Sequence, residues 1–400
     1  MRHNLRRPIA IMGAALVGAV ALAACGSSGG SGGSAGGASA APIVLGAVSS
    51  LTGPVPFPEV PGAAKAVFDK VNAAGGINGH QIQYIVQDDK GDPTSAAAAA
   101  RLLVDEKNAV AMVGGASLVE CSANAAYYAK SNVKVVSGTG VDPACFSSAN
   151  ISPVNTGPFE GYTALLYYAS ETLKKQKICA IIQGLPGLTE GYQAAEKRWE
   201  KITGKTPAIV DTSVTFGQDP TPAILATKNA GCDAAVFNSI EPTTISFMKI
   251  VKQQGLLDKV AWVTLASSYT DGTIKALKQQ DTLGLYANAE FTPYTSDSPD
   301  LKEWHDSLTA AGVPLTSLSQ GGYVSAKIMV DVLKGIQGDI TAESVSAALA
   351  KLKDTQAPMM GVPYSFGDGT AHNPNHASKF VQATADGWTV TTPDWIKLPA

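Results

Sequence analysis

The chain has 400 residues, of which 45% are hydrophobic and 16% charged, and its 30 Lys and Arg against 33 Asp and Glu give a net charge of −3. A chain of this length buries two domain-sized cores, and its hydrophobic content excludes a disordered protein. The charge balance shows no basic excess and argues against a nucleic-acid partner. The composition therefore indicates a globular protein with more than one lobe.

The beginning of the chain has the pattern of an export signal. Three arginines within the first seven residues precede an apolar or small run over 8–24, which is too short and too rich in Ala and Gly for a membrane span. The run ends in the sequence LAAC at 22–25, which resembles a bacterial lipobox. This predicts a lipoprotein signal peptide over 1–24 and lipidation of Cys25; the alternative is an ordinary signal peptide with an incidental cysteine.

Residues 25–41 follow as a Gly- and Ser-rich tether that has nothing to bury. No later stretch of the sequence is long and apolar enough to span a bilayer. We therefore expect an extracytoplasmic body that is anchored to the outer face of the cell membrane by lipid on Cys25. The membrane would be contacted through this anchor only.

The chain has five cysteines, and lipidation of Cys25 would leave Cys121, Cys145, Cys179 and Cys232. Outside the cytoplasm these four predict two disulfides, which can form in three connectivities; free buried thiols are the alternative. Their spacing does not match a zinc ribbon, so we expect no metal site.

The body alternates strands and helices. We expect one series with strands over 43–48, 82–86, 109–113 and 133–136, and with helices over 62–74, from Asp92-Pro93 onward and near 121–131. A second series has strands over 178–182, 207–214, 233–237 and 260–265, and helices over 190–202, 221–230 and 243–254. Such alternation predicts parallel sheets covered on both faces, and two series predict two lobes. Ligands in this architecture bind beyond the carboxyl ends of the strands.

Motifs of catalysis are missing from the sequence, which contains no nucleophile elbow, no P-loop and no dinucleotide-binding glycine motif between a strand and a helix. His372 and His376 flank Pro374, which prevents the helical spacing of a metal pair, so a surface turn is the preferred interpretation. Asp88 and Asp89 suggest acid–base chemistry, but a capping or hinge-side role at a strand end is favoured. We therefore expect no enzymatic activity and no cofactor.

Two segments, GAVSSLTGP at 46–54 and NAAGGINGHQIQYIVQDDKGDP at 72–93, resemble type I periplasmic solute-binding proteins of the leucine/isoleucine/valine-binding kind. Further matches are Gly114-Gly115, Val135–Ser137 and GVPYSFGDGTAHNP at 361–374, so the similarity runs from about residue 43 to 388. The resemblance implies an α/β fold of two Rossmann-like lobes with parallel sheets, joined by three crossovers. Such lobes close over a ligand, which is delivered to an ABC importer.

By this resemblance, lobe 1 would hold residues 43–155 plus 290–362, and lobe 2 would hold 156–289 plus 363–400. Lobe membership then favours two disulfides, Cys121–Cys145 and Cys179–Cys232. The implied partners are a small-molecule ligand and ABC permease subunits, and we expect a monomer.

The resemblance also indicates a ligand site, made of Phe57, Ser117, Leu118, Gly138, Thr139, Phe159, Leu188, Ile240, Glu241, Ala266 and Tyr269. In amino-acid-binding members, a serine hydroxyl binds the ligand carboxylate, and the aligned position here is Leu118, one residue from Ser117. A threonine hydroxyl of the family falls at Val141, and the acid that pairs with the ligand ammonium falls near Ala266. Three polar contacts to an α-amino acid are thus apolar in this sequence.

Burying an ammonium without a counter-charge costs several kcal/mol, so we expect a ligand less zwitterionic than leucine, such as a small hydrophobic or aromatic acid or amide. Glu241 is a candidate replacement for the missing acid, and a solvated glutamate at a strand end is the alternative. The preferred function is the solute-binding lipoprotein of an ABC importer, whose ligand is branched-chain amino acid-like or more hydrophobic. The alternative is a ligand-sensing receptor lipoprotein of the same fold.

Overall fold

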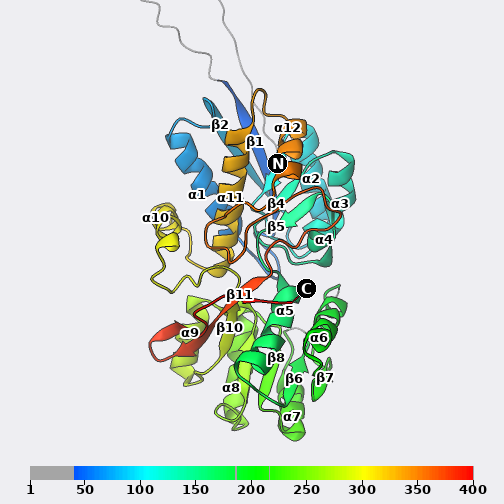
Figure 1. Ribbon diagram of the computed structural model, residues 1–400, viewed down its shortest axis with the longest axis vertical. Coiled ribbons are helices and arrows are strands. Elements are labelled where there is room, and N and C mark those ends of the chain that lie inside the picture. Colours follow the sequence, from blue (N-terminus) through cyan, green and yellow to red (C-terminus); the bar gives the residue numbers. More distant parts are fainter. Residues whose placement is uncertain (1–39, 185–186, 216, 400) are drawn as a thin grey trace, which may run out of the picture. The chain divides into compact units, whose positions relative to one another are not determined.

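The computed structural model describes residues 40–184, 187–215 and 217–399, whose helices and strands are drawn in Figure 1. The predicted signal peptide, Cys25 and the tether up to residue 39 lie outside the described residues. The last two tether residues, Ala40 and Ala41, instead begin the first strand. Within the described part, no helix has both the length and the apolar character needed to cross a membrane.

The first sheet has five parallel strands in the order β2-β1-β3-β4-β5. These strands are β1 (Ala40–Ser49), β2 (His80–Asp88), β3 (Ala111–Val113), β4 (Val135–Ser137) and β5 (Ile151–Pro153). The helices between them are α1 (Glu59–Ala73), α2 (Pro93–Arg101) with its π-helical extension Leu102–Glu106, α3 (Glu120–Lys130) and α4 (Pro143–Phe146). The expected start of the second helix is confirmed, because the Asp92 side chain accepts from the Ser95 N–H at 2.7 Å and Pro93 is the first helical residue.

Helices from late in the chain complete this first half. They are α10 (Lys302–Ala311), α11 (Ser317–Gly335) and α12 (Ala342–Lys351). Figure 1 shows α11 beside α1, and residues of both helices share one hydrophobic core with strands β1, β3 and β4. The same core includes Phe291 at one end of this late segment and Phe366 at the other.

The second sheet has the order β12-β11-β10-β9-β8-β6-β7, with β13 (Ile396–Lys397) paired to β11. Its strands are β6 (Ile178–Ile181), β7 (Ile209–Asp211), β8 (Ala234–Phe237), β9 (Ala261–Thr264), β10 (Tyr286–Ala289), β11 (Ala377–Thr384) and β12 (Gly387–Val390). Strands β6 to β10 pair in parallel, whereas β11 and β12 are antiparallel. The expected parallel sheets are therefore confirmed, and the sheet has in addition an antiparallel edge that was not predicted, in which a tight hairpin joins β11 to β12.

Five α-helices accompany the second sheet within the described residues. They are α5 (Pro158–Tyr167), α6 (Thr189–Thr203), α7 (Thr221–Ala230), α8 (Glu241–Gln253) and α9 (Asp271–Gln280). The predicted elements of this half are present, but the strand expected over 207–214 is shorter, because only 209–211 pair with β6. Two further core clusters lie on this half, and they include residues of β11 near the end of the chain.

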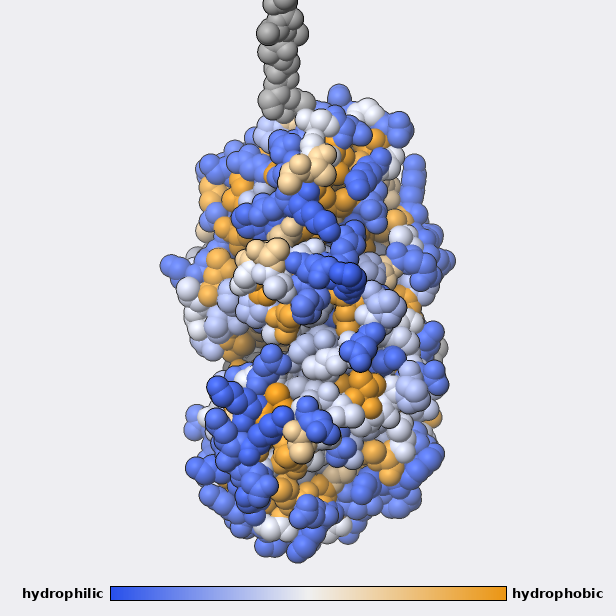
Figure 2. Space-filling view, turned by 90° about the vertical axis from the view of Figure 1, so that its left-hand side faces the viewer, coloured by the Kyte–Doolittle hydropathy of each residue, from blue (hydrophilic) through white to orange (hydrophobic). Residues whose placement is uncertain are grey.

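The chain passes between the two sheets three times: after β5, after β10 and before β11. The α/β fold with two sheet-centred halves and three crossovers is thus confirmed. Figure 2 shows one face of the molecule, on which hydrophobic and hydrophilic residues are interspersed. The large hydrophobic side chains exposed in the described part are only Val210 and Leu225, both on the second half.

Both expected disulfides are present. Cys121 in α3 is bonded to Cys145 in α4, with the two Cα atoms 5.1 Å apart. Cys179 in β6 is bonded to Cys232, just before β8, with the Cα atoms 6.0 Å apart. Each bridge therefore links neighbouring elements of the same half.

One local expectation is wrong. His372 does not lie on a surface turn: it is buried, its Nε2 lies 3.1 Å from the Ala149 carbonyl oxygen, and its backbone N–H donates to Phe146. The ring of His372 also packs against the ring of Phe366, with the ring centroids 4.8 Å apart. Burial, the largest effect, lowers the pKa of His372.

The acidic pair at the end of β2 has the capping role favoured by the sequence. Asp88 accepts hydrogen bonds from the backbone N–H groups of Leu51 and Thr52, and Asp89 accepts one from the Ser50 hydroxyl at 2.6 Å. The two carboxylates thereby fix the loop that follows β1, which leads to the functional site.

Candidate functional site

A cavity of about 100 Å³ lies between the two sheets and is lined by residues from both halves. Its wall on the first half comes from the loops after β1, β3 and β4 and from α11; the apolar side chains there are Val55, Phe57, Leu118, Val141 and Leu318. Its wall on the second half comes from α6 and from the ends of β8 and β9; the apolar side chains there are Leu188, Tyr192, Ile240, Leu265 and Ala266. The site is therefore at the carboxyl ends of parallel strands, where this architecture binds ligands.

The structure brings six of the residues suggested by the sequence together in this cavity. They are Phe57, Leu118, Thr139, Leu188, Ile240 and Ala266. The remaining five, Ser117, Gly138, Phe159, Glu241 and Tyr269, do not line it. Each of these five has another role that its contacts explain.

Ser117 caps α3, because its Oγ accepts from the N–H groups of Val119 at 3.0 Å and Glu120 at 3.1 Å. Gly138 is a point of close backbone packing, since a Cβ there would lie 2.6 Å from Cγ1 of Val60 and 3.2 Å from Cα of Gly322. Both residues therefore support the wall of the cavity on the first half without lining the cavity.

The other three residues lie on the second half. The ring of Phe159 packs edge-to-face on Tyr192, with centroids 5.3 Å apart. Tyr269 is fully buried, and its ring stacks on the ring of Tyr294 with the two ring centroids 4.3 Å apart. Glu241 is the first residue of α8, and its carboxylate accepts a hydrogen bond from the Thr270 hydroxyl. The acid suggested as a replacement at the cavity thus contacts the start of α9 instead.

The polar end of the cavity was not predicted from the sequence. It is formed by the first and second crossovers together with the end of β10, and its residues are Asn155, Gly157, Asn288 and Glu290. Asn288 and Glu290 are two residues apart along β10 and its continuation, so both side chains lie on the same face. Glu290 could have been found as an acid directly after a strand. The strand itself was not recognisable, because the sequence of β10, YANA, contains no β-branched residue.

Glu290 is buried, with only 6% of its surface exposed. Its Oε1 accepts from the Gly157 N–H at 2.8 Å and from the Asn155 side-chain amide at 3.3 Å. Burial, the largest effect, raises the pKa of Glu290 to about 7, although both hydrogen bonds oppose it. The carboxyl group therefore titrates near neutral pH while the cavity is empty.

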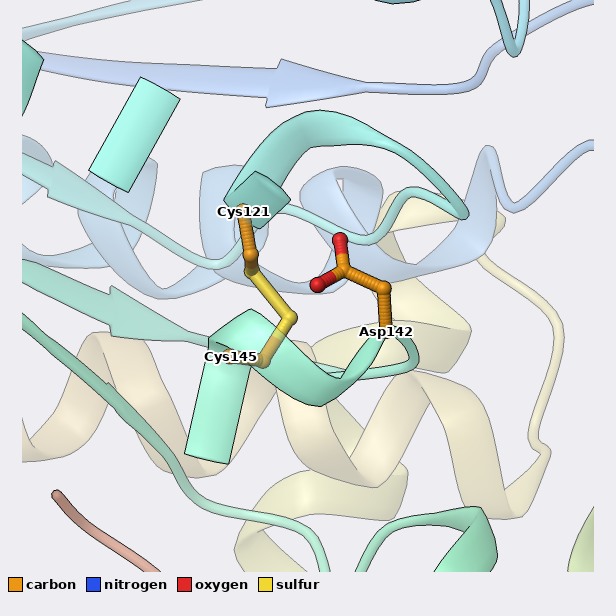
Figure 3. Close-up of side chains that lie close together, drawn as sticks. All are labelled: Cys121, Asp142 and Cys145. Atoms are coloured by element: carbon orange, nitrogen blue, oxygen red, sulfur yellow. A yellow bond between two sulfur atoms is a disulfide. The ribbon is translucent and has the colours of Figure 1, made fainter. Parts of the chain in front are cut away.

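The described residues hold one group with metal-ligating side chains, shown in Figure 3, which consists of Cys121, Asp142 and Cys145 within 4.8 Å of one another. Both sulfur atoms are in the disulfide, so neither can act as a thiolate ligand. Asp142 accepts from the Ser122 hydroxyl and from the Ala144 N–H, both at 2.8 Å. The group is therefore explained as a disulfide beside a helix cap.

Comparison with known proteins agrees with this geometry. The family model for periplasmic binding proteins matches residues 42–388. A curated amino acid binding protein of Pseudomonas aeruginosa is 24% identical over 198 residues, which cover 49% of this chain and 52% of that protein. The chain thus matches about half the length of this relative.

Solved structures with the same fold cover nearly all of the described chain. The branched-chain amino acid transporter substrate-binding protein of Streptococcus pneumoniae in complex with isoleucine has a TM-score of 0.73 at 19% identity, and covers 89% of this chain and 99% of that one. A fatty acid ABC transporter substrate-binding protein of Thermomonospora curvata has a TM-score of 0.72 at 17% identity and covers 89% and 92%. A solute-binding protein of R. palustris in complex with 4-hydroxybenzoate has a TM-score of 0.73 at 18% identity and covers 90% and 98%.

Proposed function

Since the chain belongs to the periplasmic binding protein family, we propose that it is the solute-binding component of an ABC importer and captures a small ligand between its two halves. The observation that carries the proposal is the cavity at the carboxyl ends of strands of both sheets, lined by apolar side chains with one polar end. Hinge motion at the three crossovers would open and close this cavity. The protein would bind its ligand and do no chemistry on it.

The proposed ligand is small and has an apolar body, either branched-chain amino acid-like or a more hydrophobic or aromatic acid or amide. The wall of Val55, Phe57, Leu118, Leu188 and Ile240 supports an apolar body, because apolar contacts supply most of the affinity in such pockets. Complexes of similar fold hold isoleucine in one case and 4-hydroxybenzoate in another.

We further propose that lobe 1 holds residues 43–155 plus 290–362 and that lobe 2 holds 156–289 plus 363–400. The core clusters support this division in outline, because the late helices pack with the first sheet and residues from 377 onward with the second; Tyr364 and Phe366 still pack with the first sheet, so the boundary near 362 falls a few residues later. The two disulfides suit an oxidising compartment. The mature protein would be a monomer held outside the cytoplasm by lipid on Cys25, with permease subunits as its partners.

A thermal-shift screen of the compact unit, residues 39–400, tests the binding function. The screen would contain branched-chain amino acids, aromatic acids, amides and sugars. A ligand at 100 times its dissociation constant adds about 2.7 kcal/mol, which corresponds to a shift of a few degrees. The control is Ala266→Phe, which fills the cavity and should abolish the shift.

Two results would contradict the proposal: no shift with any ligand, or a shift that Ala266→Phe leaves intact. Uptake of the identified ligand by vesicles that contain the cognate permease would then test transport. Binding without uptake would favour the sensing receptor instead.

A further inference from the structure

The cavity has a single charged side chain among the described residues that line it. This is Glu290, whereas Lys, Arg and His do not occur in the described wall. A buried carboxylate without a counter-charge is unfavourable, and a ligand that supplies the counter-charge would gain strongly from it. The charge pattern of the empty cavity therefore points to a ligand with a positive group.

The orientation of this carboxyl group is set before any ligand arrives. Gly157 and Asn155, both on the first crossover, donate to Oε1. No described residue donates a hydrogen bond to Oε2 of Glu290. One oxygen is thus held by the protein, and the other remains available as an acceptor.

The polar side chains of the cavity include one carboxyl group and, among the described residues, no cation. The Ser267 hydroxyl already donates to the Ser239 carbonyl oxygen at 2.7 Å, so its proton is not available to a ligand anion. A ligand group with N–H donors would satisfy the free oxygen of Glu290, whereas a ligand carboxylate would place a second acceptor beside it.

The position of Glu290 also explains how an acid reaches the cavity although Ala266 is apolar. Strands β9 and β10 are parallel neighbours, with Thr264 opposite Ala287. The residues that follow these two strands therefore reach the same edge of the sheet, and both Ala266 and Glu290 line the cavity. The residue after β10, Glu290, therefore provides the acid that is missing after β9.

We propose that Glu290 binds a protonated amine of the ligand, whose apolar body lies against the wall of Phe57, Leu118 and Leu188. This inference rests on the proposed solute-binding function; within its ligand class it selects apolar amino acids over acids and amides, and it adds simple apolar amines. It assigns to Glu290 the role that the sequence suggested for Glu241.

Three probes with the same isobutyl body test the proposal by calorimetry on residues 39–400. They are leucine, 3-methylbutylamine, which lacks the carboxylate, and 4-methylpentanoate, which lacks the amine. We expect the amine-bearing probes to bind and 4-methylpentanoate to bind at least tenfold more weakly. Comparison of leucine with 3-methylbutylamine shows whether the ligand is an amino acid or a simple amine.

Glu290→Gln keeps an acceptor for Gly157 but removes the charge. It should weaken binding of the amine by on the order of 10- to 100-fold, as expected for loss of a charge-assisted hydrogen bond. The matched control is Glu241→Gln, which changes the same residue type outside the cavity and should leave affinity unchanged. Melting temperatures of both variants show whether they fold.

Proton release provides a test that needs no variant. Because the pKa of Glu290 is about 7 in the empty cavity, binding of an amine at pH 7 should release up to about half a proton, whereas an acid should cause uptake. Calorimetry in buffers of different ionisation enthalpy measures this number. Proton uptake, or equal binding of 4-methylpentanoate, would overturn the inference and leave the solute-binding function intact.

Absence of binding by both amine-bearing probes would also overturn the inference. The wider thermal-shift screen then decides the proposed function separately. A hit among acids or amides would support the solute-binding function and contradict the amine contact of Glu290. The absence of any hit would contradict both the function and the contact.

Discussion

The side-chain amide of Asn375 donates to the backbone carbonyl oxygen of Glu290 at 2.9 Å. The same nitrogen also donates to the Val154 carbonyl oxygen at 3.1 Å. Asn375 lies on the third crossover, Glu290 on the second and Val154 on the first. One fully buried side chain therefore connects all three segments that join the two halves.

Asn375→Ala should destabilise the protein by about 2–3 kcal/mol, because it leaves two buried carbonyl oxygens without donors. We expect this as a lowered melting temperature and a lower denaturant midpoint. Asn373→Ala, at an exposed position of the same crossover, is the control and should change stability by less than about 0.5 kcal/mol. Equal stability of the two variants would show that the Asn375 contacts do not hold the crossovers.

Glu120 makes stability depend on pH. Burial, the largest effect, raises the pKa of Glu120 to about 8, and the Tyr128 hydroxyl, which donates to Glu120 Oε1 at 2.7 Å, only partly offsets it. The folded state therefore holds this proton more tightly than the unfolded state, in which the pKa of the glutamate is near its ordinary value of 4.5. The stability from Glu120 is complete below about pH 4.5 and is lost as pH rises through about 8.

Glu120→Gln should therefore gain stability relative to the unmodified chain as pH rises from 5 to 8, by on the order of 1 kcal/mol per pH unit. Glu290 contributes the same sign of pH dependence, but it is present in both proteins and cancels in the difference. Urea unfolding at pH 5, 6, 7 and 8 measures the difference. A constant difference across this range would contradict the raised pKa.

Glu160 in α5 and Arg198 in α6 form an ion pair in which the glutamate is buried. The Oε1 of Glu160 has no other partner among the described residues. Arg198→Met should cost about 2 kcal/mol, because it leaves a buried carboxylate unpaired. Glu160→Gln combined with Arg198→Met should recover most of this loss. Lys201→Met, at an exposed position of α6, is the control and should be nearly neutral.

The two disulfides should contribute unequally to stability. The sequence separation of the cysteines is 24 for Cys121–Cys145 and 53 for Cys179–Cys232. The chain-entropy model gives about 3.5 kcal/mol for the shorter loop and about 4 kcal/mol for the longer one. Paired Cys→Ala variants, compared by melting temperature, should therefore show the larger loss for Cys179 and Cys232. The reverse order would mean that native-state packing outweighs loop entropy.

The local pattern of the sequence was sufficient for four of the five strands of the first sheet and for most of the parallel part of the second, whereas the short strand β5 was not predicted. The run IVLGAV identified β1, and Asp92-Pro93 identified the start of α2, because these signals depend on residues a few positions apart. The disulfides followed once lobe membership was inferred. Leu118, Thr139 and Ala266 were suggested for the site by the family resemblance, at positions that follow strands.

The rest of the fold and of the site depends on contacts between residues that are far apart in the sequence. The pairing of β11 with β10 joins segments about 90 residues apart, which no local pattern reports. Only glycine fits at position 322 of α11, because a Cβ there would collide with the Val60 carbonyl oxygen of α1. This contact, too, cannot be inferred from the local sequence. The sequence placed an acid at Glu241 because the residue follows a strand, but its carboxylate contacts Thr270, while Glu290 on the second crossover lines the cavity.

Glu290 lies on a connecting segment and is held by residues of another connecting segment, Asn155 and Gly157. In the proposed hinge motion, a group in this place would keep its surroundings while the two sheets rotate apart, whereas the apolar wall would be complete only when they approach. Binding would then have two kinetic phases. The first is an encounter at the carboxylate whose rate falls with ionic strength, and the second is a slower step that salt leaves unchanged.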